Sequence, residues 1–149
     1  MSEAPRRLST RPTYLLTQTA THARRLVTEV FGAECARGYH YRLLATLHEF
    51  GPASQAELGR RGNMDRSDVV NALNELAAEG HAERTPDPAD GRRNIIRITP
   101  AGKERLRRLD HALDSAQDRL TAPLSAAERD QLVELLGRLL AHHEQSTPD

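Results

Sequence analysis

The fold is decided by residues 65–102, which read DRSDVVNALNELAAEGHAERTPDPADGRRNIIRITPAG. Apolar side chains recur at spacings of three and four over residues 69–77, which is the pattern of one helix face. Asp65 occupies the N-cap position, where a short acidic side chain is favoured, and Gly80 supplies the C-terminal stop. The first part of the stretch is therefore predicted to be a helix over residues 65–79.

The second part of the stretch predicts a β-hairpin with a basic loop. A short arm over residues 81–85 is followed by the turn-rich segment PDPADGRR. Ile96 and Ile98 then alternate with a charged residue, as in a half-buried strand. Thr99 and Pro100 restart a helix, as its N-cap and first helical residue. Helix, strand, basic loop, strand and helix is the order of elements in a winged helix.

A helix-turn-helix is predicted immediately before this hairpin. Ser54 and Glu57 stand three residues apart as a capping box, which predicts a short helix over residues 55–61. A three-residue turn separates this short helix from the longer one that follows, as in a helix-turn-helix. Another helix is expected over residues 39–50, where a Gly-Pro pair ends it.

These motifs resemble the MarR-type (multiple antibiotic resistance regulator) family of repressors. The wing motif D-x-R-x-x-x-I-x-I-T-x-x-G runs from Asp90 to Gly102. The motifs Q-A-E-L-x-x-R and D-R-S-x-V-x-x-x-L-x-x-L-x-x-x-G match the family's paired helices, and the whole resemblance covers residues 37–108. Two positions depart from the family pattern. Asp68 stands where a small hydroxyl residue is usual, and His81-Ala82 replaces an apolar pair.

Apolar stripes on the flanking helices predict a partner chain. The stripes of the first helix and of the last two cannot all be buried against one small winged helix, so a second copy is the simplest cover. The resemblance implies the same, because MarR-like proteins dimerise through their terminal helices. We therefore expect a mostly α protein with a small β-wing. Its expected parts are a disordered basic tail (1–11) and one domain (12–149), with a winged helix-turn-helix (about 37–100) between dimerisation helices (about 12–33 and 100–144).

Charge is balanced over the chain but unevenly distributed. The formal net charge is zero. Residues 60–108 hold eleven lysines and arginines against eight acids, whereas residues 109–149 hold three against eight. Such asymmetry indicates a basic working face and an acidic remainder. The bias becomes informative because Arg92 and Arg93 lie together in the predicted loop.

The candidate DNA contacts come from the second helix of the pair and from the wing. In a major groove, Arg66 could reach guanine or a phosphate and Asn71 an adenine. Asp68 has two interpretations: an acceptor for cytosine N4, or a first-turn acid favoured by the helix dipole. The resemblance implies that Arg92 contacts DNA and that Asp90 steadies it. The full set of candidates is Arg66, Ser67, Asp68, Asn71, Arg92 and Arg93, with Asp90 as a wing-stabilising residue.

Two functions remain open from the sequence. The first, which the resemblance implies, is a homodimeric transcriptional repressor that binds double-stranded DNA at a pseudo-palindromic operator and is relieved by a small-molecule effector or another signal. Its ligand and ligand-binding residues are unknown. The second is a winged helix used as a protein-interaction module without a DNA role. The acids in the same helix favour the second function: Asp65, Asp68, Glu75 and Glu79.

No catalytic, metal or cofactor site is predicted. The sequence has no Ser/His/Asp arrangement, phosphate loop, paired-carboxylate motif or closed set of zinc ligands, so we expect no enzyme. The lone Cys35 is either an oxidant sensor or an inert small apolar residue, and His22 lines either a ligand pocket or the dimer seam. One cysteine suits a reducing compartment. Without a signal-peptide h-region or a run of ~18 apolar residues, we expect a cytoplasmic protein with no membrane contact.

Overall fold

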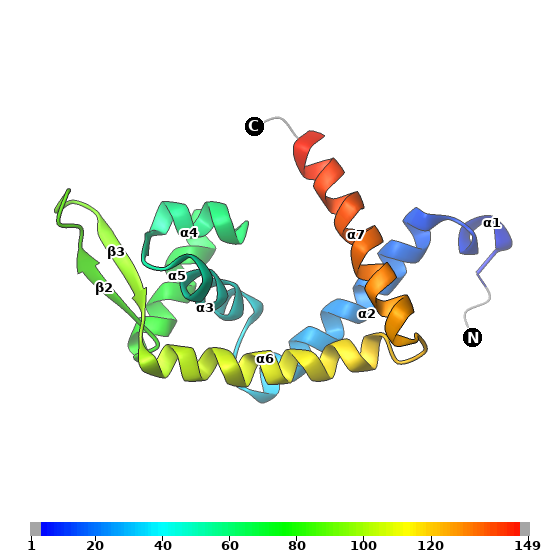
Figure 1. The fold of residues 1–149 in the computed structure, drawn as a ribbon, viewed down its shortest axis with the longest axis horizontal. Coiled ribbons are helices and arrows are strands. Elements are labelled where there is room, and N and C mark those ends of the chain that lie inside the picture. Colours follow the sequence, from blue (N-terminus) through cyan, green and yellow to red (C-terminus); the bar gives the residue numbers. More distant parts are fainter. Residues whose placement is uncertain (1–3, 147–149) are drawn as a thin grey trace.

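The computed structural model describes residues 4–146, which form seven helices and three short strands (Figure 1). Residues 1–3 and 147–149, which belong to the expected tail and domain, lie outside the described part. The predicted helices and the predicted hairpin are confirmed, with ends within a few residues of those expected. The elements are α1 (Arg6–Ser9), α2 (Pro12–Ala33), α3 (Gly38–Phe50), β1 (Ala53–Ser54), α4 (Gln55–Gly62), α5 (Arg66–Ala78), β2 (Ala82–Pro86), β3 (Asn94–Ile98), α6 (Pro100–Leu120) and α7 (Ala126–Ser146).

The segment before α2 differs from the disordered tail that the sequence predicts. Its described part contains the single-turn helix α1, which packs beside the start of α2. The carbonyl of Pro5 accepts the N–H groups of Leu8 at 2.8 Å and Ser9 at 3.1 Å, which closes the turn. Pro12 then begins α2, because proline has no N–H to lose at the first position of a helix.

The sheet has three antiparallel strands in the order β1-β3-β2, one more than the sequence predicts. Ala53 of β1 pairs with Ile96 of β3, and β2 pairs with β3 along all of its five residues. A strand of two residues carries no alternating pattern, so β1 is invisible in the sequence. It forms because the free edge of β3 offers backbone partners beside the start of α4.

The core is aliphatic and lies between α3, α4, α5, α6 and the inner face of the sheet. Its largest side chains, each less than 2% exposed, are Leu43, Leu44, Leu47, Leu58, Val69, Leu73, Ile96 and Leu109. Burying each of these side chains contributes about 1.5–3 kcal/mol. The core therefore fixes α5 against α3 and leaves the opposite face of α5 to solvent.

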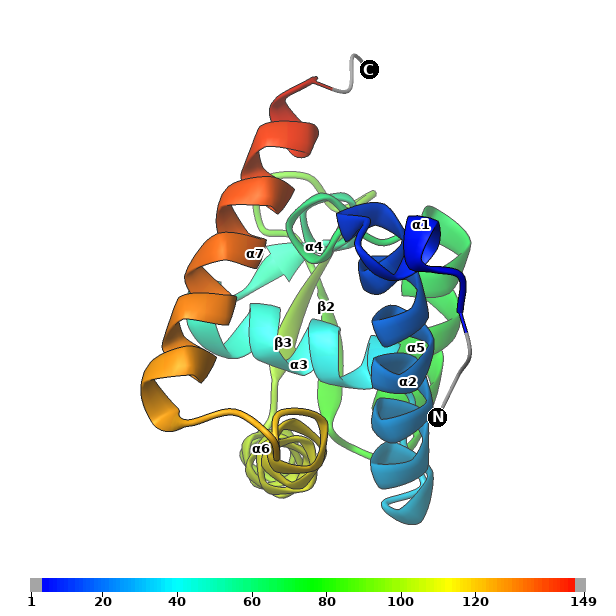
Figure 2. The ribbon, with the colours of Figure 1, turned by 90° about the vertical axis from the view of Figure 1, so that its right-hand side faces the viewer.

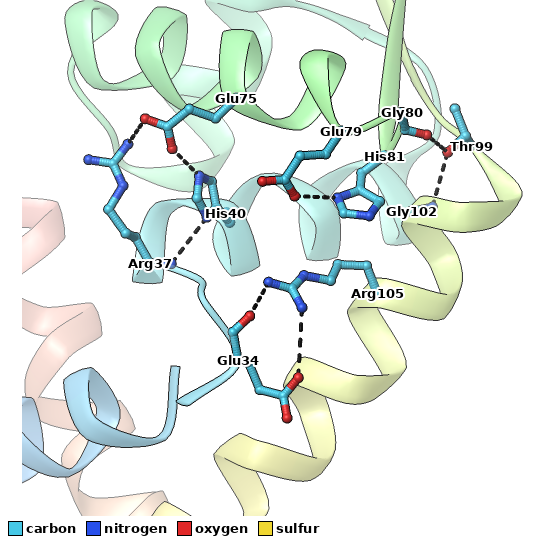
Figure 3. Close-up of polar contacts among 10 residues, drawn as sticks. All are labelled: Glu34, Arg37, His40, Glu75, Glu79, Gly80, His81, Thr99, Gly102 and Arg105. Atoms are coloured by element: carbon cyan, nitrogen blue, oxygen red, sulfur yellow. Dashed lines mark hydrogen bonds and ion pairs between the residues drawn. The ribbon is translucent and has the colours of Figure 1, made fainter. Parts of the chain in front are cut away.

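Hydrogen bonds join the residues after α5 to the start of α6. The Thr99 hydroxyl donates to the Gly80 carbonyl at 2.6 Å (Figure 3). The Thr99 N–H donates to the His81 carbonyl at 3.1 Å. The Thr99 hydroxyl also accepts the N–H of Gly102 at 3.0 Å. A Cβ at Gly102 would lie 2.0 Å from the His81 carbonyl oxygen, so only glycine fits. This close approach explains the T-x-x-G part of the wing motif.

Helix α7 stands apart from the rest of its own chain. The wing consists of β2, the loop over residues 87–93 and β3. Figure 1 shows the wing at one end of α6 and α7 at the other end of that helix. Figure 2 shows α6 end-on, with α2 and α7 on opposite sides of it. No described residue of α7 is buried. Its exposed apolar side chains are Val133, Leu135, Leu136, Leu139 and Leu140.

Candidate nucleic-acid interface

A groove of about 770 Å³ lies where α4, the start of α5 and the wing meet. Its lining includes four arginines, Arg60, Arg66, Arg92 and Arg93, and a single acid, Glu57. A hydrogen bond from the backbone N–H of Ser54 to the carboxylate of Glu57 holds the pKa of this acid below its usual value, so Glu57 is ionised at neutral pH. The groove therefore carries a net positive charge in a protein whose overall charge is zero.

The groove gathers three of the predicted contact residues and leaves three beside it. Arg66, Arg92 and Arg93 line it, although α5 and the wing are separated in the chain by the whole of β2. Ser67 and Asn71 lie on the exposed face of α5, outside the lining, and Asp68 is half-buried in the same helix. Major-groove candidates and wing candidates thus share one side of the molecule.

Within residues 4–146, the arginines of the groove form no ion pairs. Among the described residues, none of these four guanidinium groups lies within ion-pairing distance of a carboxylate. By contrast, Arg105 and Arg108 of α6 pair with Glu34, and Arg119 pairs with Glu29. These three arginines of α6 are paired with acids, whereas those of the groove keep an unpaired charge for a partner.

Arg60 is the groove residue that sequence reasoning missed. It lies in the last turn of α4, and nothing in its local pattern separates it from Arg61. Arg61 instead stacks on Phe50, with its guanidinium carbon 4.9 Å from the ring centroid. Only the angle between α4 and the wing brings Arg60 to the groove.

The wing loop is held in shape by its own aspartates. Asp87 donates its N–H to the Arg93 carbonyl at 2.8 Å, which closes the base of the loop. The Asp90 carboxylate accepts the backbone N–H of Arg92 at 3.1 Å, and the Asp90 carbonyl accepts the N–H of Arg93 at 3.0 Å. Asp90 therefore steadies the backbone that carries Arg92, rather than the guanidinium itself.

The start of α5 keeps its backbone donors available. Asp65 occupies the N-cap position, as predicted, but its carboxylate accepts no capping hydrogen bond. In α4, by contrast, Ser54 and Glu57 form the predicted capping box, with bonds of 3.3 and 2.9 Å. The first-turn N–H groups of a helix without a side-chain cap are a favourable environment for a phosphate oxygen.

One acid of α5, Glu75, is held by neighbouring side chains and stays 46% exposed. Glu75 accepts hydrogen bonds from His40 Nε2 at 2.5 Å and from Arg37 Nη2 at 2.7 Å (Figure 3). The bond from His40, followed by that from Arg37, holds the pKa of Glu75 below its usual value. His40 Nδ1 accepts the backbone N–H of Arg37, so the ring proton lies on Nε2 and points at the carboxylate. This network joins α5 to the start of α3.

His81 lies beside Glu79, the C-cap residue of α5, without forming a hydrogen bond with it. Its Nδ1 atom lies 3.3 Å from Glu79 Oε2, at an angle that makes no hydrogen bond, and it is buried (Figure 3). Burial lowers the pKa of the imidazole, against the smaller attraction of Glu79. His81 is therefore a neutral side chain next to the junction of α5 and α6.

A second, smaller cavity of about 330 Å³ lies below this junction and includes Cys35 in its lining. Cys35 is exposed and has φ +53°, because it follows the end of α2 at a position that usually carries glycine. Cys35 therefore lies outside the core, and its exposure alone does not distinguish an oxidant sensor from an inert residue. His22 is also exposed, with its Nδ1 atom 3.5 Å from an Arg25 nitrogen, and it lines neither of these two cavities.

Residues 4–146 contain neither a metal-binding cluster nor a membrane-spanning helix. No group of three or more histidine, cysteine or acidic side chains there is arranged to hold a metal ion. No helix in the same range combines the length and the apolar character that crossing a membrane requires. The basic groove is therefore the feature of the described chain with the clearest chemical preference.

Comparisons with known proteins agree with this geometry. A family model described as the MarR family matches residues 37–93. A protein described as a transcriptional regulatory protein for the hcr operon of Thauera aromatica is 33% identical over 108 residues, covering 72% of this chain and 64% of that protein. The solved structure of a transcriptional regulator from Pseudomonas aeruginosa is 31% identical, with a TM-score of 0.78, and the match covers 89% of this chain and 98% of that one.

A ligand-bound structure is also similar. The PcaV transcriptional regulator of Streptomyces coelicolor, solved in complex with its natural ligand, is 26% identical with a TM-score of 0.76. The match covers 95% of this chain and 98% of that one. Because the chain spans less than two thirds of the length of the Thauera protein, the operon of that protein is not assigned to this chain.

Proposed function

Because this chain belongs to the MarR family of transcriptional regulators, we propose that it binds double-stranded DNA as a homodimer and regulates adjacent genes. The proteins of this family are regulators and not enzymes. The observation that carries this proposal is the groove between α4, α5 and the wing. Its four arginines have no ion pair with any residue that the structure describes, in a chain of zero net charge. Such a groove favours a polyanion.

The groove suggests how a duplex would lie. Helix α5 enters the major groove with its N-terminal turn first, so that Arg66 reaches a guanine edge or a phosphate. Asn71, one turn further along, faces an adenine. The wing then lies over the adjacent minor groove, with Arg92 directed at its narrow, negative interior. Phosphates between the two grooves are opposite Arg60 and Arg93.

The dimer is proposed from the surfaces that one chain leaves uncovered. The exposed leucines of α7 and those of α2, Leu15 and Leu16, form apolar area that residues 4–146 of the same chain leave uncovered. A second copy related by a two-fold axis covers such area and presents two copies of α5. The operator is then a pseudo-palindrome, with half-sites about one helical turn apart.

Repression follows from occupying DNA next to a promoter, and relief follows if an effector binds the DNA-free arrangement better. A ligand-bound relative supports an effector for this chain, since the PcaV structure contains its natural ligand.

The competing function, a protein-interaction module, loses support from one of its four acids. Glu75 is held by His40 and Arg37, so its carboxylate already has partners within the protein. Glu79 is 56% exposed and makes no hydrogen bond with His81. Asp65 and Asp68 stay near the start of α5, where acids also suit the helix dipole.

A fluorescence anisotropy titration against random-sequence duplex at low and high salt separates the two functions. The DNA-binding function requires affinity at low salt that falls steeply as salt rises, because phosphate contacts release counterions. A footprint on the DNA flanking the protein's own coding region then locates the operator. Absence of binding at low salt would leave the interaction module as the better account.

A further inference from the structure

Arg84 connects the wing to α5. It lies on β2, and its Nη2 atom donates a hydrogen bond of 2.8 Å to Oδ1 of Asn74 on α5. Among the described residues, this is the hydrogen bond between side chains that joins β2 to α5. The contact therefore spans the two elements that carry the candidate DNA contacts.

The direction of the Arg84 side chain follows from strand alternation. Its neighbour Glu83 is exposed, whereas Ala82, two residues earlier, is buried. Arg84 stands opposite Ile96 in the sheet register, and Ile96 is fully buried. An arginine on this inner face cannot point straight into solvent. Its Nε atom is buried and has no hydrogen-bond partner, and Asn74 holds the guanidinium through Nη2.

The position of this contact suits a brace. Only two residue pairs of the hairpin lie beyond Arg84, and the loop over residues 87–93 follows them. A small rotation at the level of Arg84 therefore moves the whole loop that carries Arg92. At the other end of the contact, Asn74 lies about one helical turn from Asn71. The brace thus links the base of the wing with the exposed face of α5.

We propose that Arg84 and Asn74 set the angle between the wing and α5, so that Arg92 reaches the minor groove while α5 occupies the major groove. This inference rests on the proposed DNA-binding function. Arg84 is a positioning residue and does not itself contact DNA. The planar guanidinium suits the role, because less of its freedom is lost per hydrogen bond than with the flexible ammonium of lysine.

The test is a double-mutant cycle on DNA binding. The probe is a duplex that the wild-type protein selects from a random-sequence pool. Arg84→Met removes the guanidinium and keeps the side-chain stem, and Arg92→Ala removes the wing-tip contact. The matched control is Arg97→Met, which removes the same charge from the exposed face of β3, one residue from Ile96. Asn74→Ala, an exposed position, breaks the brace from the helix side and serves if Arg84→Met fails to fold.

The proposal expects the two losses to overlap. Once the wing is misplaced, Arg92→Ala costs at least about threefold less affinity in the Arg84→Met background than in the wild type. The salt slope of the double variant matches that of Arg92→Ala alone, about one unit below the wild type. Arg97→Met leaves the cost of Arg92→Ala unchanged. Asn74→Ala behaves as Arg84→Met does.

Three results would overturn the brace. Additive losses with a slope reduced by about two units would make Arg84 a direct phosphate contact. A loss from Arg97→Met equal to that from Arg84→Met would mean diffuse charge. Unfolding at lower temperature with unchanged affinity would mean a purely structural bond. If the wild type selects no duplex, the proposed function fails; residual dipolar couplings of the free protein, compared between Arg84→Met and Arg97→Met, then decide whether Arg84 holds the wing angle.

Discussion

Asp68 is the candidate contact whose role the fold leaves most open. It sits in the first turn of α5, half-buried, between the exposed Ser67 and the fully buried Val69. A carboxylate at this position interacts favourably with the helix dipole in any context. In a major groove it repels phosphates and is tolerated only next to a donor such as cytosine N4. The two roles give different consequences when the carboxylate is removed.

For Asp68→Ala we expect higher non-specific affinity and lost discrimination at one base position of each half-site, because a charge that repels phosphate and reads a base is gone. The measurement is a binding series over every single-base variant of the operator, with wild type and variant. If Asp68 serves the dipole alone, the base profile stays unchanged and stability falls by about 0.3–1 kcal/mol.

Arg92→Ala is expected to weaken operator binding by about 1–3 kcal/mol at moderate salt and to flatten the salt slope by about one unit, because one contact with the duplex is removed. Arg60 is unsuitable as a control, since it lines the same groove. Arg107 is suitable, being 73% exposed on α6 and outside the groove lining. Equal losses in Arg92→Ala and Arg107→Ala would indicate diffuse charge rather than a wing contact.

The sequence located the wing arginines but not Arg60, for a physical reason. Arg92 and Arg93 sit in a loop whose turn residues identify it without any knowledge of packing. The relevance of Arg60 depends on where the last turn of α4 ends up relative to that loop, which tertiary contacts decide. Cys35 shows the same limit, because its exposure follows from the left-handed turn after α2.

Among the secondary-structure elements, helix ends were predictable and the third strand was not. Ser54 and Thr99 accept the N–H bonds that their N-cap positions predict, from Glu57 and Gly102. These signals are local, so the sequence alone carries them. Strand β1 depends on the edge of β3, about forty residues later in the chain, and has no local signal of its own.

The junction of α5, β2 and α6 should respond to pH through His81. Burial holds the pKa of its imidazole below the ordinary value of 6.5, so the unfolded chain binds the proton more readily than the folded chain does. The contribution of the neutral ring is fully present above pH 6.5 and is lost as pH falls below it.

We therefore expect the free energy of unfolding of the wild type to fall more steeply than that of His81→Gln on acidification from pH 7. Denaturant titrations of both proteins at several pH values measure this difference, and the remaining histidines cancel in the comparison. Parallel pH dependences would show that His81 titrates alike in the folded and unfolded states.

For the molecule as a whole, the distribution of charge and of apolar surface indicates where DNA and a second copy of the chain would bind. The groove is basic although the net charge is zero, and α7 carries apolar side chains that its own chain leaves exposed. Both features were predictable from charge counts and helical stripes. The placement of α7 on the opposite side of α6 from α2 was not, because periodicity shows that a face is apolar without showing where its helix lies (Figure 2).

The dimer is tested by placing charges on that face. Leu136 and Leu140, 39% and 60% exposed, lie on one side of α7, so Leu136→Glu with Leu140→Glu should give monomer or unfolded chain. Sedimentation at micromolar concentration should show a dimer for the wild type. Arg138→Glu, on the other side of the same helix, should leave the dimer intact. A well-folded wild-type monomer would contradict the proposed assembly.

The most direct test of the groove as a DNA interface is backbone hydrogen exchange with and without the selected duplex, using a scrambled duplex as the control. First-turn amides of α5 have no intrahelical partner and exchange quickly in the free protein. Binding should slow exchange over residues 66–71 and 87–93 together, more with the selected duplex than with the scrambled one. Unchanged exchange in both segments, or slowing confined to α7, would contradict the account.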